Sequence, residues 1–227
     1  MIGIIGAMAI EVKALKKMIE EPETKIISGI EFWSGKINGK DVVVAECGIG
    51  KVFAGICAEI MILEYKPDFI INTGVGGTLT DKLGIGDIAV ASRVCQHDMD
   101  TTPIGDPRGL LGSLGTVYVD CDEGLVKKVS EACTKLKINH CVGTIATGDQ
   151  FISSNEQRDF IRANFENTVS CEMEGGAIGQ VCMANKVPFV IVRAISDNAN
   201  GGAPADFGAV VKAATKNNIA VLNEAMF

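Results

Sequence analysis

Short apolar runs, rich in β-branched residues, alternate along this chain with longer segments whose apolar positions recur about every 3.6 residues. Most of the short runs are apolar at consecutive positions, which is typical of strands buried on both faces. We expect strands at 1–8, 41–47, 68–74, 87–92, 141–148, 168–173 and 188–195. The longer segments predict amphipathic helices, at 9–20, 51–65, 122–137, 154–164, 174–185 and 206–226.

This alternation predicts an α/β fold, a three-layer α/β/α domain around a central mixed, largely parallel sheet. With 227 residues, of which 47% are hydrophobic, the chain can bury one full core, and we expect a single domain over residues 1–227. The one long irregular stretch, about 96–116, contains four Gly and two Pro. A loop of that length inside a compact domain is typical of a lid or an interface element.

Charge and hydropathy narrow the classes of partner. The net charge of −7 argues against nucleic acid or an anionic membrane, because clustered Lys and Arg usually hold such partners. No apolar run reaches the roughly 18 residues of a membrane span, and no leader pattern opens the chain. We therefore expect a soluble, cytoplasmic protein whose partner is a small molecule or another protein.

The eight cysteines include no Cys-x-x-Cys pair, and most lie inside apolar runs. This distribution predicts reduced, buried thiols rather than a disulfide framework or a zinc site. Only two histidines are present, so a His-rich metal site is also poorly supplied, and we expect neither a metal nor a cofactor.

Candidate chemistry lies just after the predicted strands, because ligands of open α/β sheets bind beyond the carboxyl ends of the strands. Four of the six segments found there contain a carboxylate, and several acids at one sheet edge indicate acid–base chemistry or hydroxyl recognition. The six segments are Glu11, Gly48–Gly50, Gly74–Gly77, Asp149–Ile152, Glu172–Glu174 and Ser196–Asp197.

Each of these features also has a simpler explanation. Glu11 fits a helix first turn, where the dipole favours an acid, and Asp197 fits a helix cap or a turn. Two acids at 172 and 174 would also suit a solvated edge, and the Gly-x-Gly pairs lack the spacing of a triphosphate-binding loop. Arg193 is harder to explain, because a guanidinium inside the apolar run VIVRAI is costly unless a carboxylate pairs with it.

Six motifs in order give the combination its specificity: GIIGAMAIEV, CGIGKV, INTGVGG, TGDQFI, CEMEGGAI and VRAISD. Together they resemble the motifs of the 5′-methylthioadenosine/S-adenosylhomocysteine nucleosidases, within the nucleoside phosphorylase superfamily. The resemblance runs from about residue 2 to residue 220. It implies a nucleoside phosphorylase-like fold, a homodimer, and hydrolysis of a nucleoside to adenine and a 5-thioribose without a cofactor.

The resemblance also implies a role for each matched residue. Glu11 would orient or deprotonate the attacking water, Asp197 would protonate the leaving adenine, and Glu174 would accept hydrogen bonds from the ribose hydroxyls. The other matched positions are Met173 under the ribose, Phe151 and Ile152 at the adenine, Met8, Ile49 and Phe207 around the ribose and 5′-alkylthio group, and Ser196 and Arg193 as supporting residues.

These roles agree with the chemistry of N-glycosidic bonds. Cleavage passes through an oxocarbenium-like sugar, so an acid must neutralise the departing base while a water is held on the opposite face. A guanidinium beside Asp197 would keep that carboxylate ionised and oppose its task as an acid. We therefore expect Arg193 to lie closer to Glu11 than to Asp197.

Two positions depart from the family pattern. Ile104 stands where an aromatic residue is usual, in a divergent 98–112 loop that the resemblance places at the 5′ pocket and the dimer contact. Val75 replaces a Ser found in some members, which removes one hydrogen bond near the water. The preferred 5′ group therefore stays open, and 5′-deoxyadenosine or 6-amino-6-deoxyfutalosine are alternatives to the thioadenosines.

Two further classes of function remain as alternatives. A purine nucleoside phosphorylase would need basic groups early in the chain to bind phosphate, whereas the segment GAMAIE offers apolar residues and a Glu. A nucleoside-binding relative without catalysis would be expected to lose Glu11 or Asp197, and both are present. The apolar helix at 52–63 is compatible with a dimer interface or with a buried core.

Overall fold

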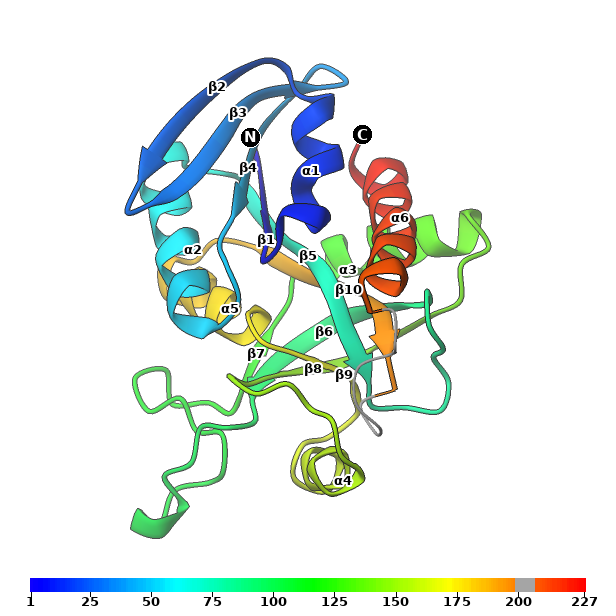
Figure 1. Cartoon of the computed structure of the whole chain (residues 1–227). Coiled ribbons are helices and arrows are strands. Elements are labelled where there is room, and N and C mark those ends of the chain that lie inside the picture. Colours follow the sequence, from blue (N-terminus) through cyan, green and yellow to red (C-terminus); the bar gives the residue numbers. More distant parts are fainter. Residues whose placement is uncertain (199–206) are drawn as a thin grey trace.

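A computed structural model describes residues 1–198 and 207–227, with side chains in the second range described from 208 onward (Figure 1). The chain forms an α/β fold, as the alternating pattern predicts. The strands are β1 (Ile2–Gly6), β2 (Glu20–Ile27), β3 (Ile30–Ile37), β4 (Lys40–Glu46), β5 (Phe69–Thr78), β6 (Ile88–Gln96), β7 (Tyr118–Asp120), β8 (His140–Thr147), β9 (Thr168–Glu172) and β10 (Phe189–Asp197). The helices are α1 (Ala9–Met18), α2 (Lys51–Tyr65), α3 (Glu123–Lys135), α4 (Asn155–Asn164), α5 (Gly175–Asn185) and α6 (Phe207–Met226).

The described strands form one mixed, ten-stranded sheet in the order β10-β6-β8-β9-β5-β1-β4-β3-β2, with β7 added beside β6. β1 runs parallel to both β4 and β5, and β10 runs parallel to β5. β5 also pairs with β9, while β10 also pairs with β6, so this end of the sheet closes on itself. The closure brings the carboxyl ends of β5, β9 and β10 to one place.

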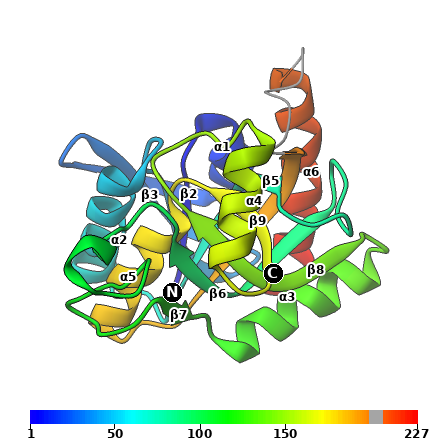
Figure 2. The ribbon, with the colours of Figure 1, turned by 90° about the horizontal axis from the view of Figure 1, so that it is seen from below.

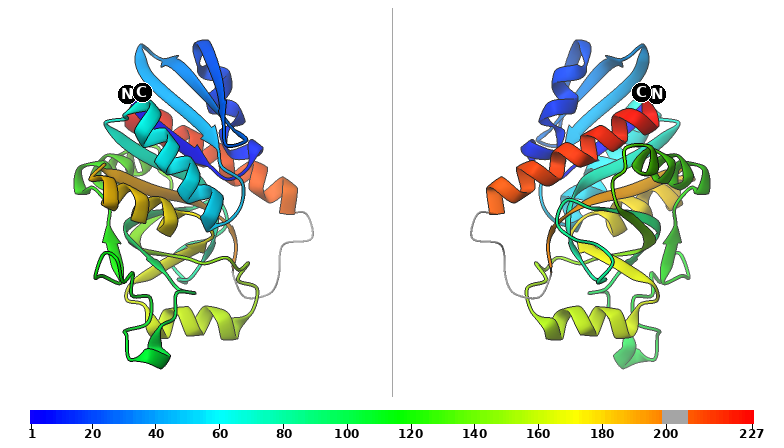
Figure 3. Two further views of the ribbon diagram at one scale, coloured as in Figure 1. Left: turned by 90° about the vertical axis from the view of Figure 1, so that its left-hand side faces the viewer. Right: turned by 90° about the vertical axis from the view of Figure 1, so that its right-hand side faces the viewer.

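Helices cover both faces of the sheet, which gives the three predicted layers. α2 and α5 pack on one face around a core that includes Ala54 and Ile178, and they lie side by side in Figure 2. α1, α3 and α6 cover the other face, where Leu15, Val129 and Leu222 are fully buried. Both chain ends lie at the same end of the molecule, the upper end in Figure 1 and in Figure 3. No helix among the described residues is long and apolar enough to cross a membrane.

The hairpin of β2 and β3 is absent from the predicted elements. β2 is exposed at almost every position and contains Pro22, so it carries no apolar alternation that would indicate a strand. Two local turn signals were nevertheless present. Ser28-Gly29 connects β2 to β3, and Asn38-Gly39 connects β3 to β4. All four residues adopt positive φ, which two-residue hairpin turns require.

The segment 96–116 is irregular, as predicted. It contains a single 3-10 turn at Thr102–Ile104 and one isolated bridge between Leu111 and Thr116. The short strand β7 follows it, which the sequence pattern did not indicate. The segment projects from the body of the molecule at the lower left of Figure 1.

All eight cysteines lie in the described ranges and are free, and seven of them are buried. Their burial confirms the prediction that these thiols pack as small apolar side chains. Burial raises the pKa of the Cys57 and Cys182 thiols to about 12, so neither is an active nucleophile near neutral pH.

This thiol distribution predicts a labelling pattern. Without reductant, an alkylating reagent should modify eight cysteines in denaturant, but in native buffer it should modify Cys141 first, because that thiol alone is partly exposed. Mass spectrometry would count the modified cysteines in native buffer and in denaturant, for the wild type and for Cys141→Ser. Fewer than eight modifications in denaturant would reveal a disulfide that the structure lacks.

Candidate active site

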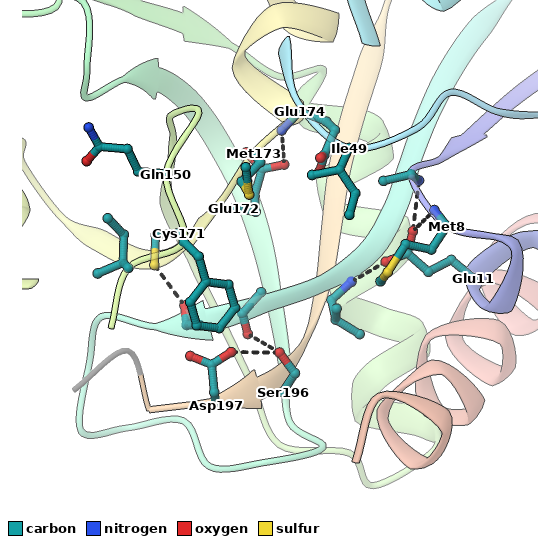
Figure 4. Close-up of a pocket in the computed structure, with 16 residues that line it drawn as sticks. Met8, Glu11, Ile49, Gln150, Cys171, Glu172, Met173, Glu174, Ser196 and Asp197 are labelled. Atoms are coloured by element: carbon teal, nitrogen blue, oxygen red, sulfur yellow. Dashed lines mark hydrogen bonds between the residues drawn. The ribbon is translucent and has the colours of Figure 1, made fainter. Parts of the chain in front are cut away.

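One pocket gathers most of the residues singled out in the sequence (Figure 4). It encloses about 650 Å³ of space, the open solvent at its mouth included. Nine of the eleven predicted site residues line it: Met8, Glu11, Ile49, Phe151, Ile152, Met173, Glu174, Ser196 and Asp197. The other lining residues are Ala7, Val75, Gly76, Gly77, Gln150, Cys171 and Glu172.

Glu11 is a buried carboxylate fixed by three main-chain amides. It occupies the first turn of α1 and accepts from the amides of Ala7 (2.8 Å) and Met8 (2.9 Å), so it caps the helix as the simpler interpretation proposed. Its other oxygen accepts from the Val75 amide at 3.0 Å and faces the pocket. Burial raises the pKa of Glu11 despite these donors and the nearby Arg193 charge. Capping and a pocket role are therefore compatible.

Gly74 leaves room for the Glu11 carboxylate. A Cβ built at position 74 would stand 2.6 Å from Glu11 Oε1, closer than real Cβ contacts. The three amide bonds hold the carboxylate, so it cannot easily move aside. Gly74, the first glycine of INTGVGG, is thus required because the Glu11 side chain approaches it closely. Phosphate binding is not needed to explain this glycine.

A β-bulge near the end of β10 aims two consecutive side chains into the pocket. The pairing of β10 with β5 shifts register between Ile195 and Asp197. In a regular strand neighbouring side chains point to opposite faces, whereas here Ser196 and Asp197 both line the pocket. Ser196 Oγ donates to Asp197 Oδ2 at 2.8 Å and holds this buried carboxylate in place.

Arg193 lies behind the pocket in the middle of β10 and is fully buried. It donates to Glu172 and to Asn72 Oδ1 (2.5 Å), and it lies 3.7 Å from Glu174 Oε2. Among the described residues its ion-pair partners are thus Glu172 and Glu174, and its charge also acts on Glu11. The sequence correctly predicted that Arg193 has a carboxylate partner and that this partner is not Asp197. The direct partner is Glu172 rather than Glu11.

Glu174 is the N-cap residue of α5, yet its side chain does not cap the helix. Its carboxylate accepts instead from the Gly50 amide at 2.9 Å, across the pocket at the start of α2. Desolvation, followed by the neighbouring Glu172 charge, raises the pKa of Glu174 to about 7. Near neutral pH this carboxylate is therefore close to its titration point.

A polar cluster outside the pocket fixes the turn that carries Gly50. The Asp149 carboxylate accepts from the Lys51 amide at 2.8 Å, and Lys51 Nζ pairs with Asp98 at 2.6 Å. Asp98 in turn accepts from the Asp149 amide at 2.9 Å. The cluster ties the segment before Phe151 to the start of α2, so two walls of the pocket keep their spacing.

Apolar side chains form the rest of the pocket. Ile152 is buried, Met8 and Met173 are partly buried, and Phe151 and Ile49 are exposed at the mouth. The side chain of Phe207 lies outside the described residues, although its backbone begins α6. No residue of the 98–112 loop lines the pocket within this chain as described.

Sequence reasoning collected Glu172 among the acids after strands but gave it no role. Gln150, within the collected segment Asp149–Ile152, was likewise given no role, and Cys171 was not collected, although both line the pocket. The signal for Glu172 was Arg193 itself, since a buried guanidinium requires a buried acid. Within the described ranges, no group of three His, Cys, Asp or Glu residues is arranged to hold a metal ion.

The family model of the phosphorylase superfamily matches residues 1–226. The chain is 42% identical to the 5′-methylthioadenosine/S-adenosylhomocysteine nucleosidase of Shewanella loihica, over 98% of this chain and 97% of that protein. The Neisseria meningitidis nucleosidase of the same name, in complex with methylthio-immucillin-A, superposes with a TM-score of 0.94 at 32% identity, covering 99% and 97% of the two chains. Futalosine hydrolase of Helicobacter pylori gives a TM-score of 0.93 at 31% identity, covering 99% and 96%.

The close approach at Gly74 predicts a steric effect. Gly74→Ala should lower the free energy of unfolding by about 1–3 kcal/mol, because the added methyl group collides with the fixed Glu11 carboxylate. Gly84→Ala is the matched control, since its Cβ would meet nothing closer than 3.8 Å, and it should change stability by less than about 0.5 kcal/mol. Denaturant unfolding of the three proteins measures this, and equal stabilities would contradict it.

Proposed function

This chain belongs to the phosphorylase superfamily, and we propose from that premise how its pocket works. The protein is a nucleosidase that hydrolyses the N-glycosidic bond of 5′-methylthioadenosine and S-adenosylhomocysteine, releasing adenine and a 5-thioribose. The observation that carries our assignment of roles is the presence of Glu11, Glu174 and Asp197, all buried, in one pocket.

Asp197 protonates the departing adenine in the proposed mechanism. The leaving base carries the bonding electron pair, so an acid within hydrogen-bond reach lowers the barrier to its departure. Asp197 lies at the end of β10 and lines the pocket, and the Ser196 hydroxyl donates to one of its carboxylate oxygens at 2.8 Å. Phe151 and Ile152 hold the adenine there by stacking and by main-chain hydrogen bonds.

Glu11 activates the water on the other side of the sugar. The amides of Ala7, Met8 and Val75 fix the orientation of its carboxylate, and its raised pKa brings it closer to the working pH, where a general base is most effective. Arg193 lies behind this position and supports it with positive charge. Water thus attacks the sugar on the face opposite the departing base.

Glu174 binds the ribose hydroxyls. An ionised carboxylate accepts hydrogen bonds, so this role requires the deprotonated form, and the bond from Gly50 orients it toward the sugar. Met173 packs under the ribose. Met8, Ile49 and Phe207 surround the 5′ substituent with apolar surface, which suits an alkylthio group.

A nucleosidase for another 5′ group is the second candidate. The likeness to futalosine hydrolase over nearly the whole chain supports it, as does the divergent 98–112 loop with Ile104 80% exposed. A 6-amino-6-deoxyfutalosine or 5′-deoxyadenosine substrate would use the same Glu11, Glu174 and Asp197. Phosphorolysis is disfavoured, because the phosphate would meet Glu11 and the apolar segment before it rather than basic residues.

We also propose a cytoplasmic homodimer. The exposed face of α2 carries Val52, Phe53, Ile56 and Leu63, and Ile49 continues this surface to the mouth of the pocket. A contiguous apolar face of this kind is typical of a protein interface. The eight free cysteines suit a reducing compartment.

The reaction is tested by adenine release. The wild type in phosphate-free buffer should release adenine and methylthioribose from 5′-methylthioadenosine, measured by chromatography, and added phosphate should not be required. Parallel reactions with 5′-deoxyadenosine and 6-amino-6-deoxyfutalosine assign the 5′ group. Cleavage of only one of those alternatives would replace the thioadenosine assignment, and release that needs phosphate would indicate a phosphorylase.

The catalytic roles predict two inactive variants. Asp197→Asn and Glu11→Gln should each lower kcat by at least about 10²-fold, the usual contribution of a general acid or base, with substrate binding partly retained. Asp159→Asn, on the exposed side of α4, is the control and should match the wild type. Steady-state kinetics that show near-normal kcat for either site variant would remove that residue from its role.

The dimer predicts a charge-sensitive interface. Val52→Glu should convert the dimer to a monomer in sedimentation velocity, because it places a carboxylate on the α2 face. Ile26→Glu, at an equally exposed position on β2, should leave the dimer intact. A wild type that sediments as a monomer, or a Val52→Glu protein that stays dimeric, would contradict the proposed interface.

A further inference from the structure

Glu172 has no task in the proposed reaction, although its carboxylate accepts four hydrogen bonds from described residues. Its Oε2 atom accepts from Arg193, from the Gly175 amide (2.7 Å) and from the Glu174 amide (3.0 Å). Its Oε1 atom accepts from the hydroxyl of Thr147. The side chain is 2% exposed, so these bonds replace almost all of its contact with water.

We propose that Glu172 is a positioning residue that takes the hydrogen bond of Arg193 and thereby leaves the Glu174 carboxylate free to bind the ribose hydroxyls instead of the guanidinium. The inference rests on the proposed nucleosidase reaction and adds a residue to it. Glu172 acts through its two neighbours and does not need to touch the substrate.

Geometry shows a competition between two carboxylates for one cation. The Arg193 guanidinium is hydrogen-bonded to Glu172, whereas Glu174 Oε2 stands 3.7 Å from the same nitrogen, beyond hydrogen-bond distance. Glu172 holds this position because the first amides of α5 and Thr147 already fix it there. Glu174 is consequently left with the Gly50 amide and an open side toward the pocket.

The charges around the sugar follow from this pairing. The neutral Arg193–Glu172 pair leaves Glu11 and Glu174 as the acids beside the ribose, and negative charge fixed there stabilises an oxocarbenium-like transition state. A direct Arg193–Glu174 pair would cancel that charge and occupy the oxygens that accept the hydroxyls.

The other groups near Glu172 contribute little charge. Burial lowers the pKa of His97, which therefore stays neutral near pH 7, and burial raises the pKa of the Cys95 and Cys171 thiols. Thr147 and Asn72 are uncharged. Asp197 lies farther along the pocket, beyond Cys171. The protonation of Glu174 thus depends mainly on burial, Glu172, Arg193 and Glu11, the causes that also set its raised pKa.

Glu172→Gln separates this role from simple helix capping. A Gln oxygen can still accept from the amides of α5, but the unpaired Arg193 should attract Glu174 and hold it ionised. In the free protein, ¹³C NMR of labelled Glu carboxyls should show the Glu174 titration, assigned by its loss in Glu174→Gln, shifted from about 7 to lower pH by roughly one unit. The acid limb of kcat/KM should shift in the same direction, and KM for 5′-methylthioadenosine should rise about 10-fold.

Three further proteins complete the test. Glu172→Asp keeps the charge, so the Glu174 titration should stay near its wild-type position, and Glu166→Gln, which breaks an exposed pair with Arg93, should change nothing. Glu172→Gln/Arg193→Met removes both charges and should restore the high Glu174 titration, which also keeps the test valid if the single variant does not fold. In a Glu174→Gln background, Glu172→Gln should cause little further increase in KM.

The outcomes separate the two proposals. An unshifted Glu174 titration in Glu172→Gln, or a double variant that titrates as low as the single one, would overturn the positioning role. Full additivity of the two Glu→Gln changes in KM would do the same, because two independent structural roles add. A wild type that releases no adenine would refute the nucleosidase function, while the titration experiment would still decide the charge pairing.

Discussion

The buried ion pair of Arg193 and Glu172 is the interaction on which the pocket depends. A guanidinium in a fully buried strand must be neutralised, and the acid that does this is the last residue of β9, two residues before Glu174. The pair therefore links β10 to β9 and fixes the first turn of α5, which begins directly after Glu174. Its desolvation cost is met by the amides, Thr147 and Asn72 that surround it.

The closed end of the sheet explains how acids from distant segments meet. β5 pairs with β1, β9 and β10. The carboxyl ends of these strands therefore converge, although more than a hundred residues separate β1 from β10 in the sequence. Glu11 comes from the helix after β1, Glu174 from the turn after β9, and Asp197 from the bulge of β10. The sheet places them, and hydrogen bonds then orient each carboxylate: main-chain amides donate to Glu11 and Glu174, and the Ser196 hydroxyl donates to Asp197.

The sequence was informative wherever local pattern and burial agree. The apolar runs gave seven strands and the periodic segments gave six helices, because their side chains are buried as the pattern implies. The β2–β3 hairpin was not predicted, because β2 is exposed at almost every position and carries no such pattern, and β3 buries only Ile30, Phe32 and Ile37. The bulge at Ser196 and the choice of Glu172 as partner for Arg193 depend on contacts between distant segments, so no local pattern contains them.

Burial of the lining residues decreases from the floor of the pocket to its mouth, and this gradient determines which substitutions such a protein tolerates during evolution. Its acids are almost completely buried and fixed by hydrogen bonds, whereas Ile49 at the mouth is 63% exposed. Substitutions at the mouth disturb little packing, while substitutions at the floor meet fixed carboxylates. Selectivity for the 5′ group can therefore change at small cost in stability, while the residues that break the bond stay constant. Neutral variation is then expected to produce proteins that share this scaffold and differ in substrate.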